Sequence, residues 1–360
     1  MREIVINRRQ YLELEKIALG AFAPLRGFMD EAELESVVEQ MRLPTGEVFP
    51  IPVILDLTTD QVKQVHGASC ISLIFQGSQV GTITVTSVFS CDKEAISDKV
   101  FGTRDARHPG VAHFLEMGST FLGGPVQRIR RASFEFSQYE LTPEETRASF
   151  FDRGWHTIVG FQTRNVPHRA HEYLLRLALE YADGLFIQPL VGRKKRGDFQ
   201  PLAIVAGYRT LIDNFFPPNR VLFGILSTAM RYAGPREALF HAMIRRNYGC
   251  THFIIGRNHA GVGDYYPDYE AHELTRQFEN ELGIHILRMS GPFYCELCDG
   301  IVTERTCQHL VTAPKQTRHI SGTDVRAMLL QGGPIPREVM RPEVVASLAQ
   351  SPMFIEEDEE

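Results

Sequence analysis

Three side chains that bind anions well, Arg164, His168 and His171, lie in one short stretch of the chain. An apolar, β-branched run precedes this stretch and an amphipathic helical pattern follows it, which predicts strand, loop and helix. A helix N-terminus presents free N–H groups and the positive end of the helix dipole, so this order of elements is typical of phosphate-binding sites. We expect Pro167 at the first helical position, with both histidines on one face of the first turn. The sequence thus predicts an active site for a nucleotide triphosphate.

The two histidines also have a simpler explanation as ordinary surface residues of an amphipathic helix, because short motifs often occur by chance. A zinc-protease motif is excluded, since it needs histidines four apart with Glu after the first, and Arg169 follows His168 here.

Composition limits the classes of protein to consider. A chain of 360 residues is long enough for two or three domains. Its 43% hydrophobic and 23% charged content is typical of soluble globular proteins. The net charge of −6 gives no general attraction for nucleic acid. No long apolar run or signal-peptide pattern is evident, so we expect no membrane association and a cytoplasmic location.

Short apolar runs separated by turn residues characterise the first third of the chain. Runs at 49–55, 70–75 and 80–85 predict a β-rich, barrel-like domain, decorated by helices at 31–41 and 110–115. A new region is expected to begin near Tyr139. There Thr142, Pro143 and Glu145 predict a helix that starts with a capping box.

From there, predicted strands and helices alternate, which indicates a parallel sheet covered on both faces with ligands at the carboxyl ends of the strands. The strands are expected at 157–161, 185–190, 220–226 and 251–255, and the helices at 170–181, 202–215 and 236–247.

Each of these strands leads to a loop with basic side chains. The later loops are 192–198, with four consecutive cations, 230–237 and 256–263. A solvated charge run is the alternative for the first of them. The chain has neither a GxxxxGK[ST] nor a GxSxG motif, so a P-loop site and a nucleophile elbow are excluded. The pattern favours a site that aligns two anions for direct displacement.

A cysteine cluster near the C-terminal end predicts a closed structural zinc site. Its spacing is Cys-x2-Cys-x8-Cys-x-His, and a full set of four ligands leaves no open position for catalysis. Reduced core cysteines are the alternative. The expected ligands are Cys295, Cys298, Cys307 and His309.

Taken together, these motifs resemble the ATP sulfurylase (sulfate adenylyltransferase) family, in its monofunctional prokaryotic form with a zinc motif. The resemblance spans nearly the whole chain. It is carried by residues 20–29, 108–110, 162–171, 230–237, 247–253, 256–261, 320–326 and 341–344.

The resemblance implies an α/β multidomain fold. It consists of an N-terminal PUA-like β-barrel domain at 1–139, a central Rossmann-like nucleotidyltransferase domain with a parallel sheet and the zinc motif at 140–310, and a small C-terminal α/β subdomain at 311–360. The implied reaction converts ATP and sulfate to adenosine 5′-phosphosulfate and pyrophosphate. Mg²⁺ with the nucleotide, structural Zn²⁺ and a homodimer are implied as well.

The family pattern also implies roles for single residues. Gln162 and Arg164 would hold sulfate with the backbone of Ala260, and Thr163, Arg164 and Asn165 would surround the α-phosphate. His168 and His171 would bind the β- and γ-phosphates. The remaining nucleotide contacts would come from Gln162, Asn165, Gly256, Arg257, Asn258, His259, Met289 and Ser290.

Two positions depart from the more familiar motifs: Val166-Pro167 shifts a proline by one, and Asn258 replaces an aspartate. Neither change deletes an implied sulfate or phosphate contact. A related nucleotidyltransferase that uses another oxyanion or a phosphorylated acceptor is the alternative enzyme. An RNA-binding protein is a further alternative, disfavoured by the acidic balance.

Overall fold

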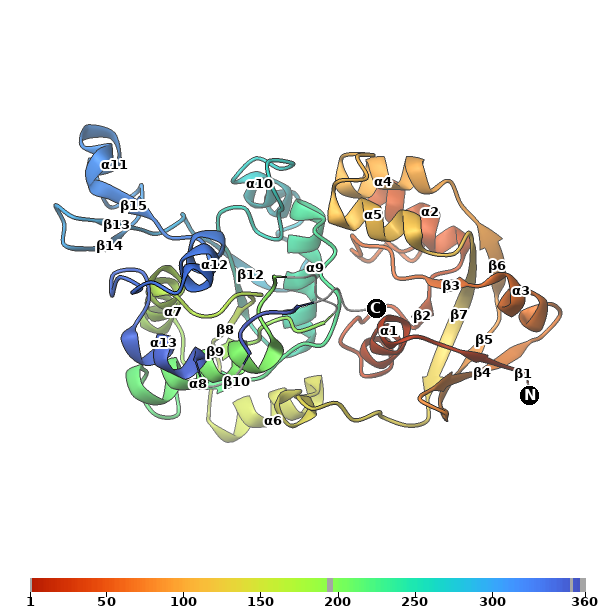
Figure 1. Ribbon diagram of the computed structural model, residues 1–360. Helices are drawn as coiled ribbons and strands as arrows, with labels where there is room; N and C mark the ends of the chain where they lie inside the picture. Colours follow the sequence, from red (N-terminus) through yellow and green to blue (C-terminus); the bar gives the residue numbers. More distant parts are fainter. Residues whose placement is uncertain (1, 193–196, 350–351, 357–360) are drawn as a thin grey trace.

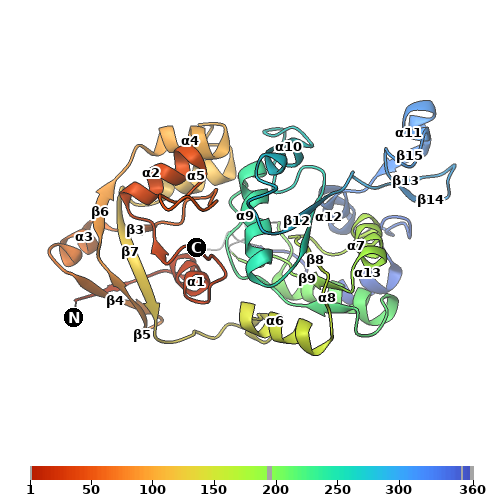
Figure 2. The same cartoon turned by 180° about the vertical axis from the view of Figure 1, so that it is seen from behind.

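The computed structural model describes residues 2–192, 197–349 and 352–356. Figures 1 and 2 show an N-terminal part, drawn in red to yellow, beside a larger part that contains the rest of the chain. The strands β13, β14 and β15 project from the larger part at the end remote from the N-terminal part.

The N-terminal part is built on one curled and mostly antiparallel sheet. Its long strand β7 pairs with β5, β2, β3 and β6, and β1 pairs in parallel with β4. The predicted PUA-like, β-rich fold is confirmed. The strands are β1 (Arg2–Val5), β2 (Gly27–Phe28), β3 (Leu55–Leu57), β4 (Cys70–Phe75), β5 (Ser78–Thr84), β6 (Ser87–Ser90) and β7 (Thr120–Arg128). The helices are α1 (Arg8–Ala18), α2 (Glu31–Gln40), α3 (Thr59–Val65), α4 (Lys93–Phe101) and α5 (Pro109–Glu116).

The strand predicted at 49–55 is wrong except for its last residue, Leu55, which begins β3. Pro50 and Pro52 explain the difference, because neither has an N–H to donate to a sheet. The segment is nevertheless apolar for a reason, since Phe49 and Ile51 are buried in the core.

The central part contains the predicted parallel sheet. Its strand order is β10-β9-β8-β11-β12, and every pairing is parallel. The chain runs outward through β8, β9 and β10 and then returns to the other side of β8, so the order reverses between β8 and β11. The strands are β8 (Ile158–Phe161), β9 (Gly184–Ile187), β10 (Val221–Phe223), β11 (His252–Ile255) and β12 (His285–Arg288), of which β12 was not predicted.

Helices cover both faces of this sheet. Figure 1 shows α9 between the sheet and the N-terminal part, where Phe240 of α9 packs on Phe22 with ring centroids 5.0 Å apart. On the other face, α7, α8 and α13 share one apolar core. The helices are α6 (Pro143–Asp152), α7 (Arg169–Tyr181), α8 (Pro201–Phe215), α9 (Gly234–Asn247) and α10 (Glu270–Gln277), and a short 3-10 turn, η1 (Ser137–Tyr139), precedes them.

Helix starts test the capping predictions directly. The capping box of α6 is confirmed, with Thr142 accepting from the N–H of Glu145 and the Glu145 carboxylate accepting from the N–H of Thr142. The predicted start of α7 at Pro167 is wrong. His168 is the N-cap, and its Nδ1 accepts the N–H of His171 at 3.4 Å. The imidazole caps the helix, and Pro167 lies one residue before the cap and not at the first helical position.

The C-terminal part returns to the central sheet. Strands β13 (Phe293–Cys295) and β14 (Gly300–Val302) form a hairpin that β15 (Thr317–His319) joins from beyond residue 310. Helix α12 contributes Val325 to the core shared by α7 and α8. The domain boundaries at 139 and 310 remain predictions. The other elements are α11 (His309–Thr312), η2 (Pro314–Gln316), α12 (Gly322–Gln331) and α13 (Pro342–Leu348).

Candidate functional site

An open cleft of about 1190 Å³ lies at the carboxyl ends of β8 and β11. These are the neighbouring strands at which the order reverses, the position where open α/β sheets bind their ligands. The loop after β8 and the loop after β11 form opposite walls. Predicted site residues that line the cleft are Gln162, Thr163, Arg164, Asn165, His168, His171, Gly256, Arg257, Asn258, His259, Ala260 and Ser290.

The guanidinium of Arg164 faces this cleft with part of its hydrogen-bonding capacity unused. Its Cζ lies 4.8 Å from the centre of the Tyr232 ring, which positions the group by a cation–π contact. Its Nη1 is buried and has no hydrogen-bond partner among the described residues. A buried cationic donor without a partner is costly unless a ligand supplies an acceptor, so the site is suited to an anion.

The turn that presents Arg164 is fixed by its neighbours. The hydroxyl of Thr163 accepts the N–H of Asn165 at 3.1 Å, and the N–H of Leu190 donates to the carbonyl of Thr163 at 2.8 Å. The amide of Asn165 lies against Gly322, where a β-carbon would come within 2.3 Å of its nitrogen. The start of α12 therefore holds the Asn165 side chain in place.

His168 and His171 stack on each other with ring centroids 3.7 Å apart. The hydroxyl of Tyr208 lies 3.2 Å from Nδ1 of His171. Burial lowers the pKa of His168 to about 4, although Asp324 opposes the shift. Burial, and then the neighbouring His168, lower the pKa of His171 well below its ordinary value. Both rings are therefore neutral near pH 7 in the protein without ligand.

The wall after β11 is a tightly turned loop. Asn258 and Ala260 have φ of 49° and 58°, a left-handed conformation unusual for residues other than glycine. The N–H of Asn258 donates to the carbonyl of Asp268 at 2.6 Å. Gly291 allows Arg257 to lie close, since a β-carbon there would be 2.9 Å from its Nε. These contacts fix the turned backbone of this loop where it lines the cleft.

Several predicted basic residues do not reach the cleft. Arg231 forms an ion pair with Glu13, and Arg236 donates to the carbonyls of Val37 and Val38, so both hold the N-terminal part. The expectation that the basic loops at the strand ends meet at the ligand site is therefore wrong for these two side chains.

The N–H of Met289, a predicted nucleotide contact, donates to the carbonyl of Ile255 at 2.9 Å. The cations at 193–196 lie outside the described residues.

The cleft also has lining residues to which the sequence assigned no role. Tyr232, whose ring contacts the guanidinium of Arg164, was also missed, because no sequence motif distinguishes it from other tyrosines. The segment 320–322 was quoted for the family resemblance without a function. The additional lining residues are Phe161, Ala170, Leu174, Met230, Ile254, Gly261, Asp268, Gly291, Pro292, Ile320, Ser321 and Gly322.

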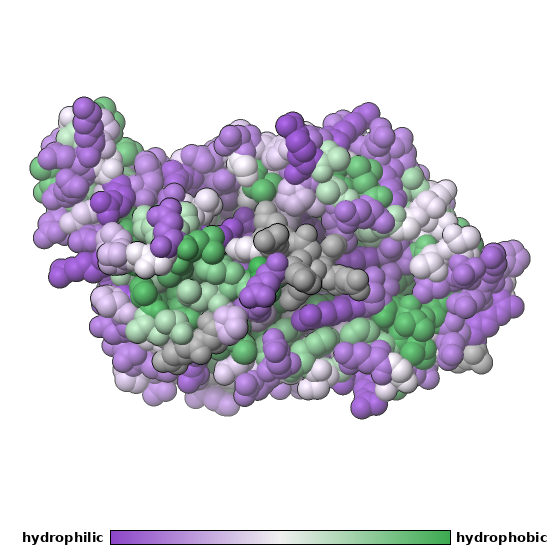
Figure 3. Space-filling model, in the orientation of Figure 1, coloured by the Kyte–Doolittle hydropathy of each residue, from purple (hydrophilic) through white to green (hydrophobic). Residues whose placement is uncertain are grey.

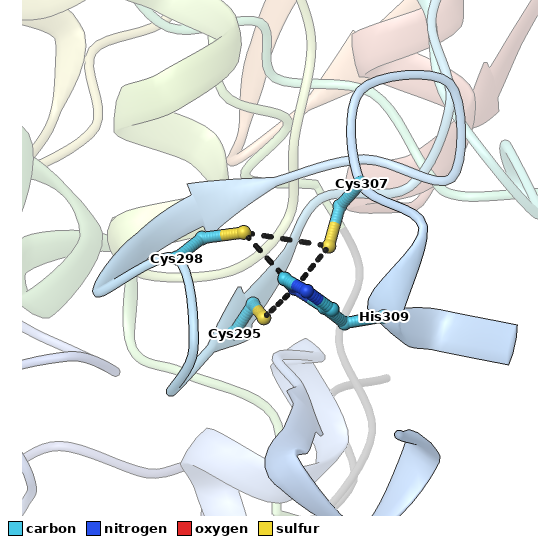
Figure 4. Close-up of side chains that lie close together, drawn as sticks. All are labelled: Cys295, Cys298, Cys307 and His309. Atoms are coloured by element: carbon cyan, nitrogen blue, oxygen red, sulfur yellow. Dashed lines mark hydrogen bonds between the residues drawn. The ribbon is translucent and has the colours of Figure 1, made fainter. Parts of the chain in front are cut away.

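The predicted cysteine cluster is assembled outside the cleft, at the turn of the β13–β14 hairpin (Figure 4). His309 Nδ1 lies 3.4 Å from the sulfur of Cys295, 3.3 Å from that of Cys298 and 3.6 Å from that of Cys307. The sulfurs of Cys298 and Cys307 are 3.6 Å apart, too far for a disulfide. Tetrahedral zinc with bonds of roughly 2.0 to 2.3 Å separates its ligand atoms by about 3.5 to 3.8 Å. The four residues therefore fit a metal ion of this kind.

Comparisons with known proteins agree with this geometry. Residues 137–351 match the ATP-sulfurylase family, and residues 1–131 match the PUA-like domain. The chain belongs to the ATP-sulfurylase family.

Similar sequences belong to proteins called sulfate adenylyltransferase. The one from Chloroflexus aurantiacus is 45% identical over 347 residues, which cover 95% of this chain and 89% of that protein. The one from Hyperthermus butylicus is 45% identical over 349 residues, covering 96% of this chain and 88% of its own length. This member of the ATP-sulfurylase family therefore matches such relatives over nearly their full lengths.

A solved structure shares the fold of this ATP-sulfurylase family member. It is described as hexameric APS kinase from Thiobacillus denitrificans, with a TM-score of 0.75 and 24% identity. The match covers 97% of this chain and 63% of that one, so this chain spans less than two thirds of the larger protein. Among the described residues of this chain, no helix is long and apolar enough to cross a membrane.

Proposed function

We propose that this protein is an ATP sulfurylase that transfers the adenylyl group of ATP to sulfate, giving adenosine 5′-phosphosulfate and pyrophosphate. A sulfate oxygen attacks the α-phosphorus in line, and the bond from that phosphorus to the β-phosphate oxygen breaks. The transfer is reversible and has no covalent intermediate on the protein. Sulfate needs no base, because it carries no proton to remove at neutral pH.

The observation that carries this proposal is the half-buried Arg164, whose Nη1 is buried and has no partner among the described residues. It lies between the two loops at the β8–β11 switch point, where acceptor and nucleotide would meet. Alignment and charge neutralisation are the main contributions that such a transfer requires from a protein. In the proposal, Gln162, Arg164 and the Ala260 backbone bind sulfate, while Thr163 and Asn165 keep the turn around the α-phosphate in shape.

His168 and His171 are proposed to hold the leaving pyrophosphate. Their stacked rings lie at the N-terminus of α7, so the helix dipole and the imidazoles act on the same phosphates. The loop 256–259 with Ser290 is proposed to hold the nucleotide on the facing wall, and Met289 contributes at most its carbonyl.

Mg²⁺ is proposed to enter with the phosphates. Asp268 is the only carboxylate among the described residues that line the cleft, so the protein offers no cage of acidic ligands. This fits an ion that keeps several waters and is held largely by phosphate oxygens. When bound, it would neutralise charge on the pyrophosphate.

Replacement of Arg164 by Ala tests the function. We expect sulfate-dependent release of pyrophosphate to fall by roughly 100- to 1000-fold, because a preorganised donor to the reacting anions is lost. Arg209→Ala is the matched control, since Arg209 pairs with Asp213 on the exposed side of α8. Activity of Arg164→Ala equal to that of the control would refute the role. Wild-type assays with selenate and molybdate would test the acceptor, and absence of any sulfate-dependent turnover would refute the function.

Zn²⁺ is the proposed occupant of the cysteine cluster, with a structural role. We expect elemental analysis to give about one zinc per chain, as a closed four-ligand site requires. Cys298→Ser should lower both zinc content and Tm, whereas Cys91→Ser, remote from the cluster, should change neither. Purified protein without zinc that is as stable as the metal-loaded form would contradict the assignment.

A homodimer in the cytoplasm completes the proposal. Figure 3 shows a largely hydrophilic face on which apolar residues gather over α12 and α13, and Leu330 of α12 is 62% exposed. A subunit contact there would cover this apolar surface. Sedimentation that gave the mass of one 40.7 kDa chain at micromolar concentration would contradict the dimer.

A further inference from the structure

Behind the nucleotide wall of the cleft lies a buried chain of three titratable side chains. Nε2 of His259 is 3.2 Å from Nδ1 of His241, and Nε2 of His241 is 3.4 Å from Oε1 of Glu237. Glu237 is 0% and His241 is 1% exposed, and both belong to α9. Only His259 reaches the cleft.

The carboxylate at the inner end is an acceptor on both oxygens. Oε1 accepts the N–H of Arg231 at 2.8 Å, and Oε2 accepts the N–H of Ala233 at 3.1 Å. The two N–H contacts favour the ionised form. Burial raises the pKa of Glu237, but the hydrogen bond and charge of His241, and then the N–H and charge of Arg231, lower it overall. Any group that forms a hydrogen bond with this ionised carboxylate must therefore be the donor.

The direction of each hydrogen bond follows from that requirement. His241 must donate from Nε2, and in its neutral form its Nδ1 is then an acceptor. His259 must consequently donate from its own Nε2. The doubly protonated, positively charged form of His241 is disfavoured, because burial and the nearby, fully buried Arg245 both lower the pKa of His241.

We propose that Glu237 and His241 are positioning residues that fix His259 as the Nε2-protonated tautomer, so that its Nδ1 is presented as a hydrogen-bond acceptor. No partner for this Nδ1 occurs among the described residues. Sulfate and the α- and β-phosphates of ATP carry no proton near pH 7 and cannot donate to it. The groups of a nucleotide that can donate are the ribose hydroxyls and the adenine amino group.

His259 therefore accepts a hydrogen bond from the nucleoside and not from the phosphates. This contact rests on the proposed function, whereas the assignment of the tautomer is independent of that function. In Glu237→Gln, an amide NH2 in the Oε1 position would donate to Nε2 of His241 and give up the N–H of Arg231. In that arrangement both hydrogen bonds reverse and the His259 proton moves to Nδ1. Glu237→Asp disturbs the same backbone contacts but keeps a carboxylate.

The first test is ¹⁵N NMR of the full-length protein without ligand, with the His259 signals assigned by their loss in His259→Gln. We expect an unprotonated Nδ1 and a protonated Nε2 in the wild type and in Glu237→Asp, and a shift toward the opposite tautomer in Glu237→Gln. A protonated Nδ1 in the wild type would overturn the proposal, and this spectrum decides even if neither variant folds.

The second test is calorimetric binding of ATP and of pyrophosphate, which has no nucleoside. Glu237→Gln should weaken ATP binding by up to about 10-fold, the effect of one mismatched hydrogen bond, and leave pyrophosphate binding unchanged. Equal weakening of both ligands would refute the nucleoside contact. Failure of the proposed function would appear separately, as absence of sulfate-dependent turnover with the tautomer as expected.

Discussion

At the residue scale, Arg164, proposed to bind sulfate, has hydrogen-bonding capacity that a ligand could use. Arg164 is fixed against Tyr232 with one nitrogen unused, and Tyr232 itself has a φ of 60°. Strain of this kind persists only where surrounding contacts impose it. The carbonyl of Tyr232 accepts from the hydroxyl of Tyr266 at 3.0 Å, and Nε2 of His108 lies 3.1 Å from the same carbonyl. The N-terminal part thus helps to orient Arg164.

The histidine pair gives a prediction about protons. Because burial lowers the pKa of His168 to about 4, and a phosphate would raise it, pyrophosphate binding should take up protons. Affinity should then increase as the pH falls from about 8 to about 6. Calorimetry in buffers of different ionisation enthalpy measures the uptake. His168→Gln serves as the control, since pyrophosphate itself titrates; the same uptake in both proteins would contradict the prediction.

The stability of the ligand-free protein should decrease as the pH falls, whereas its affinity for pyrophosphate should increase. The folded-state pKa values of His168 and His171 lie below the value of about 6.5 expected for an unfolded histidine. Their contribution to stability is therefore intact above that pH and is lost as the pH falls toward about 4. Pyrophosphate should offset part of this loss.

At the scale of elements, two helices begin at the cleft. The N-cap of α7 is His168, and the N-cap of α12 is Ser321, whose hydroxyl accepts the N–H of Asp324 at 3.1 Å. The contact between Gly322 and Asn165 joins the start of α12 to the loop after β8. A change at the beginning of α12 should therefore affect catalysis.

Gly322→Ala should lower turnover by roughly 10-fold or more with little change in Tm, because the new methyl group would displace the Asn165 amide and not backbone. Gly333→Ala is the matched control near the end of the same helix, where a β-carbon meets no atom within 4 Å. Thermal unfolding and initial rates separate the two effects. Unchanged turnover in Gly322→Ala would show that Asn165 is not held from this side.

At the scale of the whole molecule, a buried ionic cluster joins the two large parts. Nζ of Lys16 on α1 lies 2.6 Å from the Glu15 carboxylate, 2.7 Å from that of Glu140, and 2.9 Å from the hydroxyl of Ser227 in the central part. The ammonium is 0% exposed. Its removal would leave two carboxylates buried without their main partner.

Lys16→Met should therefore lower the free energy of unfolding by about 3 to 5 kcal/mol, the usual cost of breaking a buried ion pair. Lys63→Met is the control, because Lys63 and Asp60 form an exposed pair on α3 whose loss should cost about 0 to 1 kcal/mol. Urea denaturation measures both. Equal stability of the two variants would mean that other contacts join the parts.

The sequence by itself determined the local features of this protein. The capping box of α6, the alternation of strands and helices, and the grouping of three cysteines and a histidine depend on short-range spacing, and the structure has all of them. The start of α7 was mispredicted because the imidazole of His168 caps the helix. The strand at 49–55 was mispredicted because two prolines interrupt it.

Only the tertiary structure decided which basic residues share the cleft. Arg164 and Arg231 follow strands of the same sheet, yet one faces the switch point and the other an acidic side chain of the N-terminal part. The strand order, the Tyr232 support and the Glu237–His241–His259 chain join residues distant in sequence. Such contacts arise from packing between elements, which local periodicity does not encode.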